Sequence, residues 1–140
     1  MTEKFKILTQ FVKDMSSETP DVETYLYVKE YLKNYNLSID ITTKPLKNRM
    51  IEVNTKISYM DKEEIKKKSY FEITYASIVK IDEQIKDRKI IEKIILCDVQ
   101  KEIYPNIEKV FINLLSNSGF PGIRFEKKVD FEQLYNQRLS

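Results

Sequence analysis

The chain has 140 residues and a formal net charge of +2, from 24 basic and 22 acidic side chains. A hydrophobic fraction of 41% and a charged fraction of 33% predict a soluble globular protein, which we expect to form one domain over residues 1–140. The sequence has no histidine and a single cysteine, Cys97, which excludes Ser-His and Cys-His nucleophile pairs, an internal disulfide and a thiolate zinc cluster. We therefore expect a protein without catalytic activity, cofactor or metal.

The amino-terminal residues show neither the apolar core nor the small-residue cleavage site of a signal peptide. No stretch approaches the roughly 18 apolar residues that a membrane-spanning helix needs. Together with the single cysteine, these features predict a cytoplasmic protein that does not insert into a membrane. The small net charge gives little support to nucleic-acid binding.

Period-two alternation of apolar and polar residues predicts four strands. The first covers residues 5–15, with Phe5, Ile7 and Phe11 as its apolar positions, and the others cover residues 36–42, 51–59 and 70–79. The highly charged residues 61–68 predict a hairpin connection between the third and fourth strands. Short connections of this kind favour an antiparallel sheet with one buried face.

Helical periodicity replaces the alternation in the second half of the chain. One amphipathic helix is predicted from Asp87 to Gln100, and a second after Tyr104-Pro105, ending near Gly119. Asp130 is the expected N-cap of a short third helix. The sequence thus predicts an α+β fold: a four-stranded antiparallel sheet with a long crossover after the first strand, then two main helices and a short C-terminal helix.

The candidates for chemistry have simple structural interpretations. The neighbouring carboxylates Glu63-Glu64 and Asp82-Glu83 lie in lysine-rich, solvated stretches, and Cys97 lies among apolar helical residues as a core thiol. Three tyrosines, Tyr25, Tyr27 and Tyr31, cluster in the crossover, where they could line a recognition groove. The pattern alone favours the other interpretation, a small satellite core beneath the crossover.

Five motifs in a fixed order carry a resemblance to a known family. Residues 11–20 resemble an opening-strand motif of the form aromatic-x-Lys-Asp-apolar-Ser-x-Glu-x-Pro, and Ile51-Glu52-Val53 resembles the start of a third strand. Tyr104-Pro105 and Gly119-Phe120-Pro121 flank the long helix at the family's spacing, and residues 129–135 resemble its closing helix. The chain resembles the SecB family of bacterial cytosolic protein-export chaperones over nearly its full length.

The resemblance implies a homotetramer, a dimer of dimers, which holds unfolded secretory precursor proteins and delivers them to the SecA ATPase. It implies an unfolded-substrate groove formed by Tyr25, Tyr27, Tyr31, Val79 and Leu114. It also implies a SecA-binding surface formed by Asp14, Glu18, Tyr70 and Glu72. Neither surface involves a cofactor or a metal.

Two alternatives to a general export chaperone remain at this point. A SecB-like chaperone dedicated to one client, such as an antitoxin, would share the fold. A small basic nucleic-acid-binding α+β domain is less favoured, because the lysines alternate with acidic residues.

Overall fold

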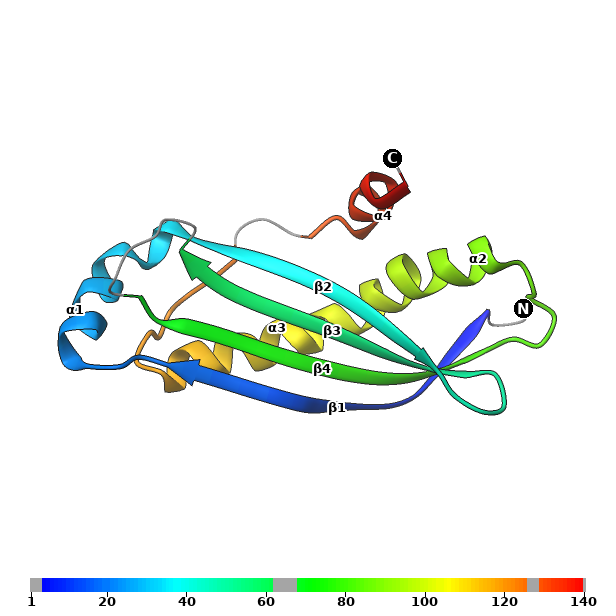
Figure 1. Cartoon of the computed structure of the whole chain (residues 1–140), viewed down its shortest axis with the longest axis horizontal. Coiled ribbons are helices and arrows are strands. Elements are labelled where there is room, and N and C mark those ends of the chain that lie inside the picture. Colours follow the sequence, from blue (N-terminus) through cyan, green and yellow to red (C-terminus); the bar gives the residue numbers. More distant parts are fainter. Residues whose placement is uncertain (1–3, 62–67, 126–128, 140) are drawn as a thin grey trace.

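The computed structural model describes residues 4–61, 68–125 and 129–139. Its elements follow the chain in the order β1 (Phe5–Glu18), α1 (Val22–Tyr31), a 3-10 turn (Leu32–Asn34), β2 (Tyr35–Pro45), β3 (Met50–Asp61), β4 (Tyr70–Ile81), α2 (Arg88–Lys93), a π-helical segment (Ile94–Val99), α3 (Gln100–Asn117) and α4 (Phe131–Leu139). Figure 1 shows the strands side by side in one long sheet, with α1 at one end.

The sheet has four antiparallel strands in the order β1-β4-β3-β2, which confirms the predicted sheet. The chain passes from one edge strand, β1, to the other, β2, through α1 at the end of the sheet (Figure 1). This passage is the predicted crossover. The fold class predicted from the sequence is therefore confirmed.

The core lies between one face of the sheet, here called the inner face, and the helices. Alternate side chains of β3 and β4 are buried on this face, as period-two alternation predicts. Apolar side chains of α3 at helical spacing pack against them and are fully buried, namely Ile103, Ile107, Phe111 and Leu115. The opposite, outer face of the sheet is not covered by these helices.

Strand β1 departs from simple alternation because its register with β4 shifts twice, between Ile7 and Thr9 and between Val12 and Asp14. Each such bulge adds one residue and exchanges the faces of the residues that follow. Phe11 consequently pairs with Ala76 on the outer face and is 46% exposed. Its prediction as a core position is wrong, whereas Phe5 and Ile7 do pack against the core.

The crossover contains a helix that the sequence pattern did not indicate. Helix α1 begins after Asp21, whose carboxylate accepts a hydrogen bond from the Thr24 amide at 2.7 Å. Only Thr24 and Val28 are buried on this helix, so its apolar stripe is too narrow to produce a clear helical period.

The helical run from Arg88 to Asn117 is continuous, and its expected interruption at Tyr104-Pro105 does not occur. Pro105 lies inside α3, where it cannot donate a hydrogen bond to the Lys101 carbonyl. Both residues are exposed, so water can take the place of the missing bond. Packing of the opposite side of the helix on the sheet outweighs the local preference of proline.

Of the two pairs of neighbouring carboxylates, Asp82-Glu83 lies within the described residues. Glu63 and Glu64 lie outside the part of the chain that the structure describes. The Asp82 carboxylate accepts a hydrogen bond from the Gln84 amide at 2.9 Å, and Glu83 is exposed. Asp82 therefore stabilises the turn before α2.

Candidate functional site

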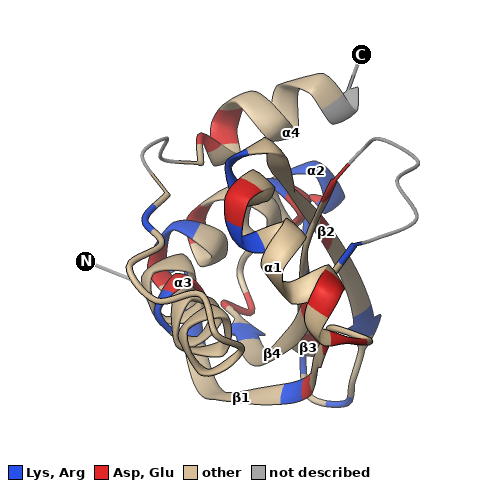
Figure 2. Ribbon diagram, turned by 90° about the vertical axis from the view of Figure 1, so that its left-hand side faces the viewer, with Lys and Arg blue, Asp and Glu red and all other residues tan. Residues whose placement is uncertain are grey.

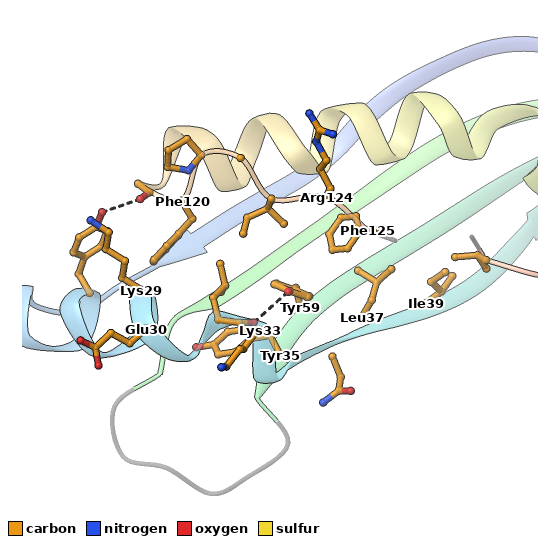
Figure 3. Close-up of a pocket in the computed structure, with 18 of the residues that line it drawn as sticks. Lys29, Glu30, Lys33, Tyr35, Leu37, Ile39, Tyr59, Phe120, Arg124 and Phe125 are labelled. Atoms are coloured by element: carbon orange, nitrogen blue, oxygen red, sulfur yellow. Dashed lines mark hydrogen bonds between the residues drawn. The ribbon is translucent and has the colours of Figure 1, made fainter. Parts of the chain in front are cut away.

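A large open groove lies beside the inner face of the sheet, with a volume of about 1470 Å³. One wall comes from α1 and the first residues of β2, and the other from residues 119–125 after α3 (Figure 3). Leu134 of α4 also lines it. We call this hollow the aromatic groove, after the rings that line it: Tyr25, Tyr35, Tyr59, Phe120 and Phe125.

The rings of the aromatic groove continue directly into the core. Tyr59 packs against Tyr35 with ring centroids 5.4 Å apart and against Phe125 edge-to-face at 5.5 Å. Phe120 packs edge-to-face on Phe71 of the core at 5.6 Å. Contacts of this kind stabilise aromatic pairs beyond the burial of their area, so the groove has a firm base.

The turn at Gly119 holds the two walls of the groove together. Gly119 has a φ of 100°, and the Tyr25 hydroxyl donates a hydrogen bond to its carbonyl at 2.8 Å. The Tyr25 ring also lies 5.2 Å from the Phe120 ring. A Cβ at position 119 would approach Tyr25 Cε1 to 2.6 Å, so only glycine fits here without movement of the ring.

The tyrosine hydroxyls of the groove are used in contacts within the protein. Tyr35 donates to the Ser69 carbonyl at 3.2 Å and Tyr59 donates to the Leu32 carbonyl at 3.3 Å. Burial raises the pKa of Tyr35 and of Tyr59, so both phenols stay neutral. A molecule in the groove therefore meets mainly ring surfaces and aliphatic side chains.

The residues that the sequence predicted for substrate binding separate into three locations. Tyr25 lines the aromatic groove. Tyr27 and Tyr31 pack on each other with ring centroids 4.6 Å apart, and Tyr31 is 40% exposed, but neither is among the residues that line the groove. Val79 is 0% exposed in the core of the single chain, and Leu114 is partly buried against that core.

Sequence reasoning missed most of the groove, including Tyr35, Tyr59 and Phe125. Two signals were available. Tyr59 ends the alternation of β3 on its inner face, and the glycine-bounded residues 119–122 place an aromatic ring, Phe120, inside a tight turn. Neither signal shows that these distant segments meet.

The four residues predicted to face SecA lie on the outer face of the sheet. In the register of β1 with β4, Glu18 pairs with Tyr70, Ser16 with Glu72, and Asp14 with Thr74. Residues that pair across antiparallel strands share a face, so these side chains form one surface, which we call the acidic strip. It comprises Asp14, Glu18, Tyr70 and Glu72.

Charge on the acidic strip is partly balanced by neighbouring groups. Glu72 accepts a hydrogen bond from the Tyr70 hydroxyl and forms an ion pair with Lys56 at 2.5 Å. Nearby on the same face, Lys13 contacts Glu52 at 2.8 Å, and hydrogen bonds from Lys13 and Asn54 lower the pKa of Glu52. Glu18 and Asp14, which are both exposed, are therefore the acidic groups of the strip that present the least compensated charge.

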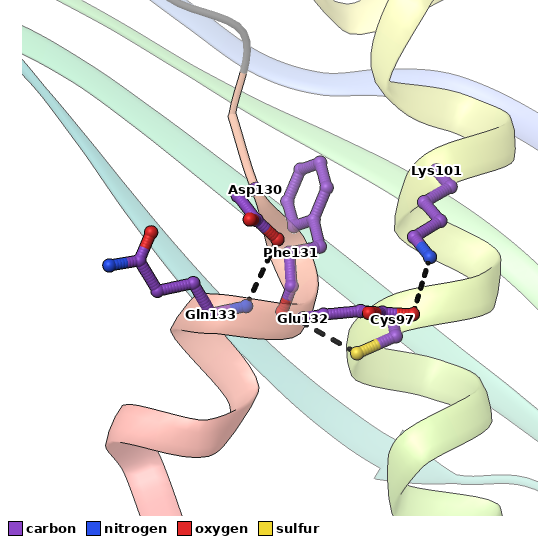
Figure 4. A network of polar contacts seen from close by, with 6 residues as sticks. All are labelled: Cys97, Lys101, Asp130, Phe131, Glu132 and Gln133. Atoms are coloured by element: carbon purple, nitrogen blue, oxygen red, sulfur yellow. Dashed lines mark hydrogen bonds and ion pairs between the residues drawn. The ribbon is translucent and has the colours of Figure 1, made fainter.

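Helix α4 is attached to the long helical run beside the groove (Figure 4). The Cys97 thiol donates to the Phe131 carbonyl at 3.4 Å, and Lys101 pairs with Glu132 at 2.9 Å. Asp130 accepts a hydrogen bond from the Gln133 amide at 3.1 Å, which confirms it as the N-cap. Because Cys97 is buried and burial raises the pKa of its thiol, it acts as a structural group.

The residues in the described ranges contain no cluster of three or more His, Cys, Asp or Glu side chains suited to a metal ion. None of their helices combines the length and apolarity needed to cross a bilayer. Figure 2 shows basic and acidic residues interleaved on helices and strands, whereas nucleic-acid binding favours a gathered basic face.

Comparisons with known proteins agree with the fold. The family model described as preprotein translocase subunit SecB matches residues 1–140. A SecB-named export protein of Pelagibacter ubique is 58% identical over 140 residues and covers 100% of both chains. The protein-export protein SecB of Parvibaculum lavamentivorans is 28% identical over 140 residues, covering 96% of this chain and 79% of its own.

One solved structure supports the architecture. It is a SecB-like chaperone of Mycobacterium tuberculosis in complex with an antitoxin peptide, similar with a TM-score of 0.66 over 90% of this chain and 91% of that one. Its sequence identity is 10%, so this likeness shows the fold alone.

Proposed function

The chain belongs to the SecB family of protein-export chaperones, and we propose that it holds unfolded secretory precursors in the aromatic groove until SecA receives them. The SecB family is a family of chaperones that bind client proteins, and it is not an enzyme family. In our proposal the 140 residues act as one chaperone domain in the cytoplasm, without a cofactor.

The observation that carries this proposal is the aromatic groove itself. A chaperone that holds many unfolded sequences needs exposed apolar surface without a narrow, shape-specific pocket. Aromatic side chains provide contact area at a small cost in conformational entropy. A groove of about 1470 Å³, open to solvent and lined by rings whose hydroxyls are already bonded, meets this requirement. Binding energy then comes from apolar burial, at roughly 25 cal/mol per Å².

Tyr27 and Tyr31 extend the apolar surface beyond the groove in this proposal. The exposed side of α1 also carries Val22 and Leu26, which supports a client path along this helix. Leu114, which is partly buried against the core near the end of α3, would support the groove. Val79 pairs with Ile7 and Ile51 toward the other end of β4, away from the lining residues, so its part in client binding would be indirect.

We assign the SecA contact to the acidic strip. Exposed carboxylates around Tyr70 suit a basic partner surface, since complementary charge accelerates encounter and fixes register. Charge reversal of Asp14 and Glu72 should therefore weaken SecA binding in a pull-down and leave client holding unchanged. Equal loss of both activities would contradict the assignment.

We further propose a homotetramer built as a dimer of dimers. Strand β1 is a sheet edge, and it carries a row of partly exposed apolar side chains, namely Leu8, Phe11, Val12 and Met15. A long edge strand with exposed apolar groups is a ready surface for pairing between chains. A second copy of β1 would cover both its backbone groups and these side chains.

The groove assignment is tested by refolding of an unfolded precursor in the presence of the chaperone. Replacing Leu37, which lines the groove, by serine should weaken client binding about tenfold through lost apolar contact. Leu46→Ser, in the β2–β3 turn outside the groove, is the matched control and should bind normally. Equal delay of refolding by both variants would contradict binding in the groove.

The contribution of the crossover is tested in the same assay. Tyr27→Ser with Tyr31→Ser should weaken client binding while the assembly persists. Unchanged binding would return these two tyrosines to a purely structural role.

A further inference from the structure

Among the described residues that line the aromatic groove, positive charge outnumbers negative charge. Lys29 and Lys33 come from α1 and the turn after it, and Arg124 comes from the opposite wall, whereas Glu30 is the one carboxylate among the described lining residues. In Figure 3, Lys33 lies beside Tyr35 and Arg124 lies across the groove on the segment that bears Phe125.

Among the described residues, no carboxylate forms an ion pair with these cations. Within the described residues, ion pairs engage Lys13, Lys56 and Lys101, and none engages Lys29, Lys33 or Arg124. All three are exposed. Their charges are therefore available to a molecule that enters the groove.

The other polar groups of the walls are largely occupied. The hydroxyls of Tyr25, Tyr35 and Tyr59 each donate to a backbone carbonyl of the protein itself. Ring faces bind apolar side chains with little discrimination between them. Discrimination between polar and charged client residues therefore depends on Lys29, Lys33 and Arg124, which we call the rim cations.

We propose that the groove prefers client segments in which an apolar or aromatic anchor is flanked by Asp or Glu. This inference rests on the proposed function, and it concerns which clients the groove selects. The aromatic rings of the groove would contact the anchor, and Lys33 and Arg124 would form ion pairs with acidic residues on either side of it. One exposed ion pair changes affinity by between about 1.4-fold and fivefold. Two such pairs together give a preference of about fivefold.

The test measures fluorescence anisotropy of three labelled peptides that share one apolar centre and differ only in flanks of Asp, Ser or Lys. At low salt we expect the Asp-flanked peptide to bind about fivefold more tightly than the Ser-flanked one, and the Lys-flanked peptide to bind most weakly. The difference should vanish at about 0.5 M salt, where exposed charges are screened.

Charge variants of the rim sharpen the test. Lys33→Glu with Arg124→Glu should invert the preference, and Lys33→Gln with Arg124→Gln should abolish it while binding of the Ser-flanked peptide persists. Lys80→Glu is the matched control, because Lys80 is exposed on β4 outside the groove and its reversal should leave the preference intact.

The possible outcomes distinguish the charge preference from the proposed holding of unfolded precursors. Equal binding of all three peptides at low salt would overturn the charge preference and leave the holding function standing. Failure of even the Ser-flanked peptide to bind would overturn both. A single-stranded oligonucleotide of matched charge that binds as tightly as the Asp-flanked peptide would assign the cations to nucleic acid and also overturn the preference.

Discussion

Replacing Gly119 by alanine tests how the turn beside the aromatic groove is fixed to α1. The left-handed backbone at this position, with a φ of 100°, costs a residue that has a Cβ roughly 1–2 kcal/mol. The new Cβ would also lie 2.6 Å from Tyr25 Cε1, so the ring must move. Movement of the ring sacrifices the hydrogen bond from Tyr25 to the Gly119 carbonyl, worth about 1 kcal/mol. We expect Gly119→Ala to lower the free energy of unfolding by about 2–3 kcal/mol.

The nearby Gly122 provides a matched control. It has a φ of 80°, but nothing lies within 4 Å of an added Cβ, so Gly122→Ala should show the backbone cost alone. Alanine also reduces the entropy of the unfolded chain by a similar amount at both positions, and this contribution cancels in the comparison. The difference between the two variants, about 1 kcal/mol, isolates the contact with Tyr25.

Urea unfolding measures both variants, at equal protomer concentration because association would shift the apparent stability. In a Tyr25→Ala background the contact no longer exists, so Gly119→Ala should then cost no more than Gly122→Ala. Equal losses for the two glycine variants in the natural background would refute the reasoning. Client binding should fall for Gly119→Ala and not for Gly122→Ala.

Three further predictions concern the helices. The Cys97 thiol, buried and bonded to Phe131, should resist alkylation in the folded protein and react in urea, and rapid labelling of the folded protein would mean that α4 is not attached as described. Lys101 lowers the pKa of Glu132, so their pairing contributes above the ordinary glutamate pKa and is lost as the pH falls through the lowered value. Glu132→Gln should therefore speed amide hydrogen exchange in α4 at neutral pH and have no effect in acid, and an equal effect in acid would exclude the ion pair as the cause. Pro105→Ala should raise the free energy of unfolding by about 1 kcal/mol or more, measured in urea, because it restores a donor within α3, and a loss of stability would show that the proline is needed there.

Strands β3 and β4 could be predicted because apolar and polar residues alternate over most of each strand. Tyr59 and Phe71, for example, are both buried on the inner face as the pattern requires. Strand β1 was harder because its two bulges change which face each residue occupies, and Phe11 was assigned to the wrong side. Bulges depend on pairing with β4, which local sequence does not contain.

The helices show the same limit. Pro105 suggested the start of a helix, but burial of Ile103 and Ile107 on either side keeps α3 continuous through it. Helix α1 was not predicted because only Thr24 and Val28 of its residues are buried, which is too few for a clear helical period. In both cases tertiary contacts decide against the local preference.

The aromatic groove could be predicted only in part. Its Tyr25 wall was suggested by the cluster of tyrosines in the crossover, and the Gly119 turn was visible as the clearest glycine-bounded turn in the chain. The meeting of Tyr59 and Phe125 joins a strand to a segment far along the sequence, and no periodicity reports such a contact. For the acidic strip, the sequence pattern showed only that Tyr70 and Glu72 share a face of β4, because they are two residues apart. Their pairing with residues of β1 depends on the register between the two strands.

The central claim is that this protein holds unfolded precursors, and native mass spectrometry of the purified protein mixed with an unfolded secretory precursor tests it most directly. The proposed function predicts a homotetramer whose mass increases by that of one precursor. For the Leu37→Ser variant it predicts that a smaller fraction of the assemblies carries a bound precursor. A monomer that ignores the precursor would leave the fold unchanged and contradict the proposed function.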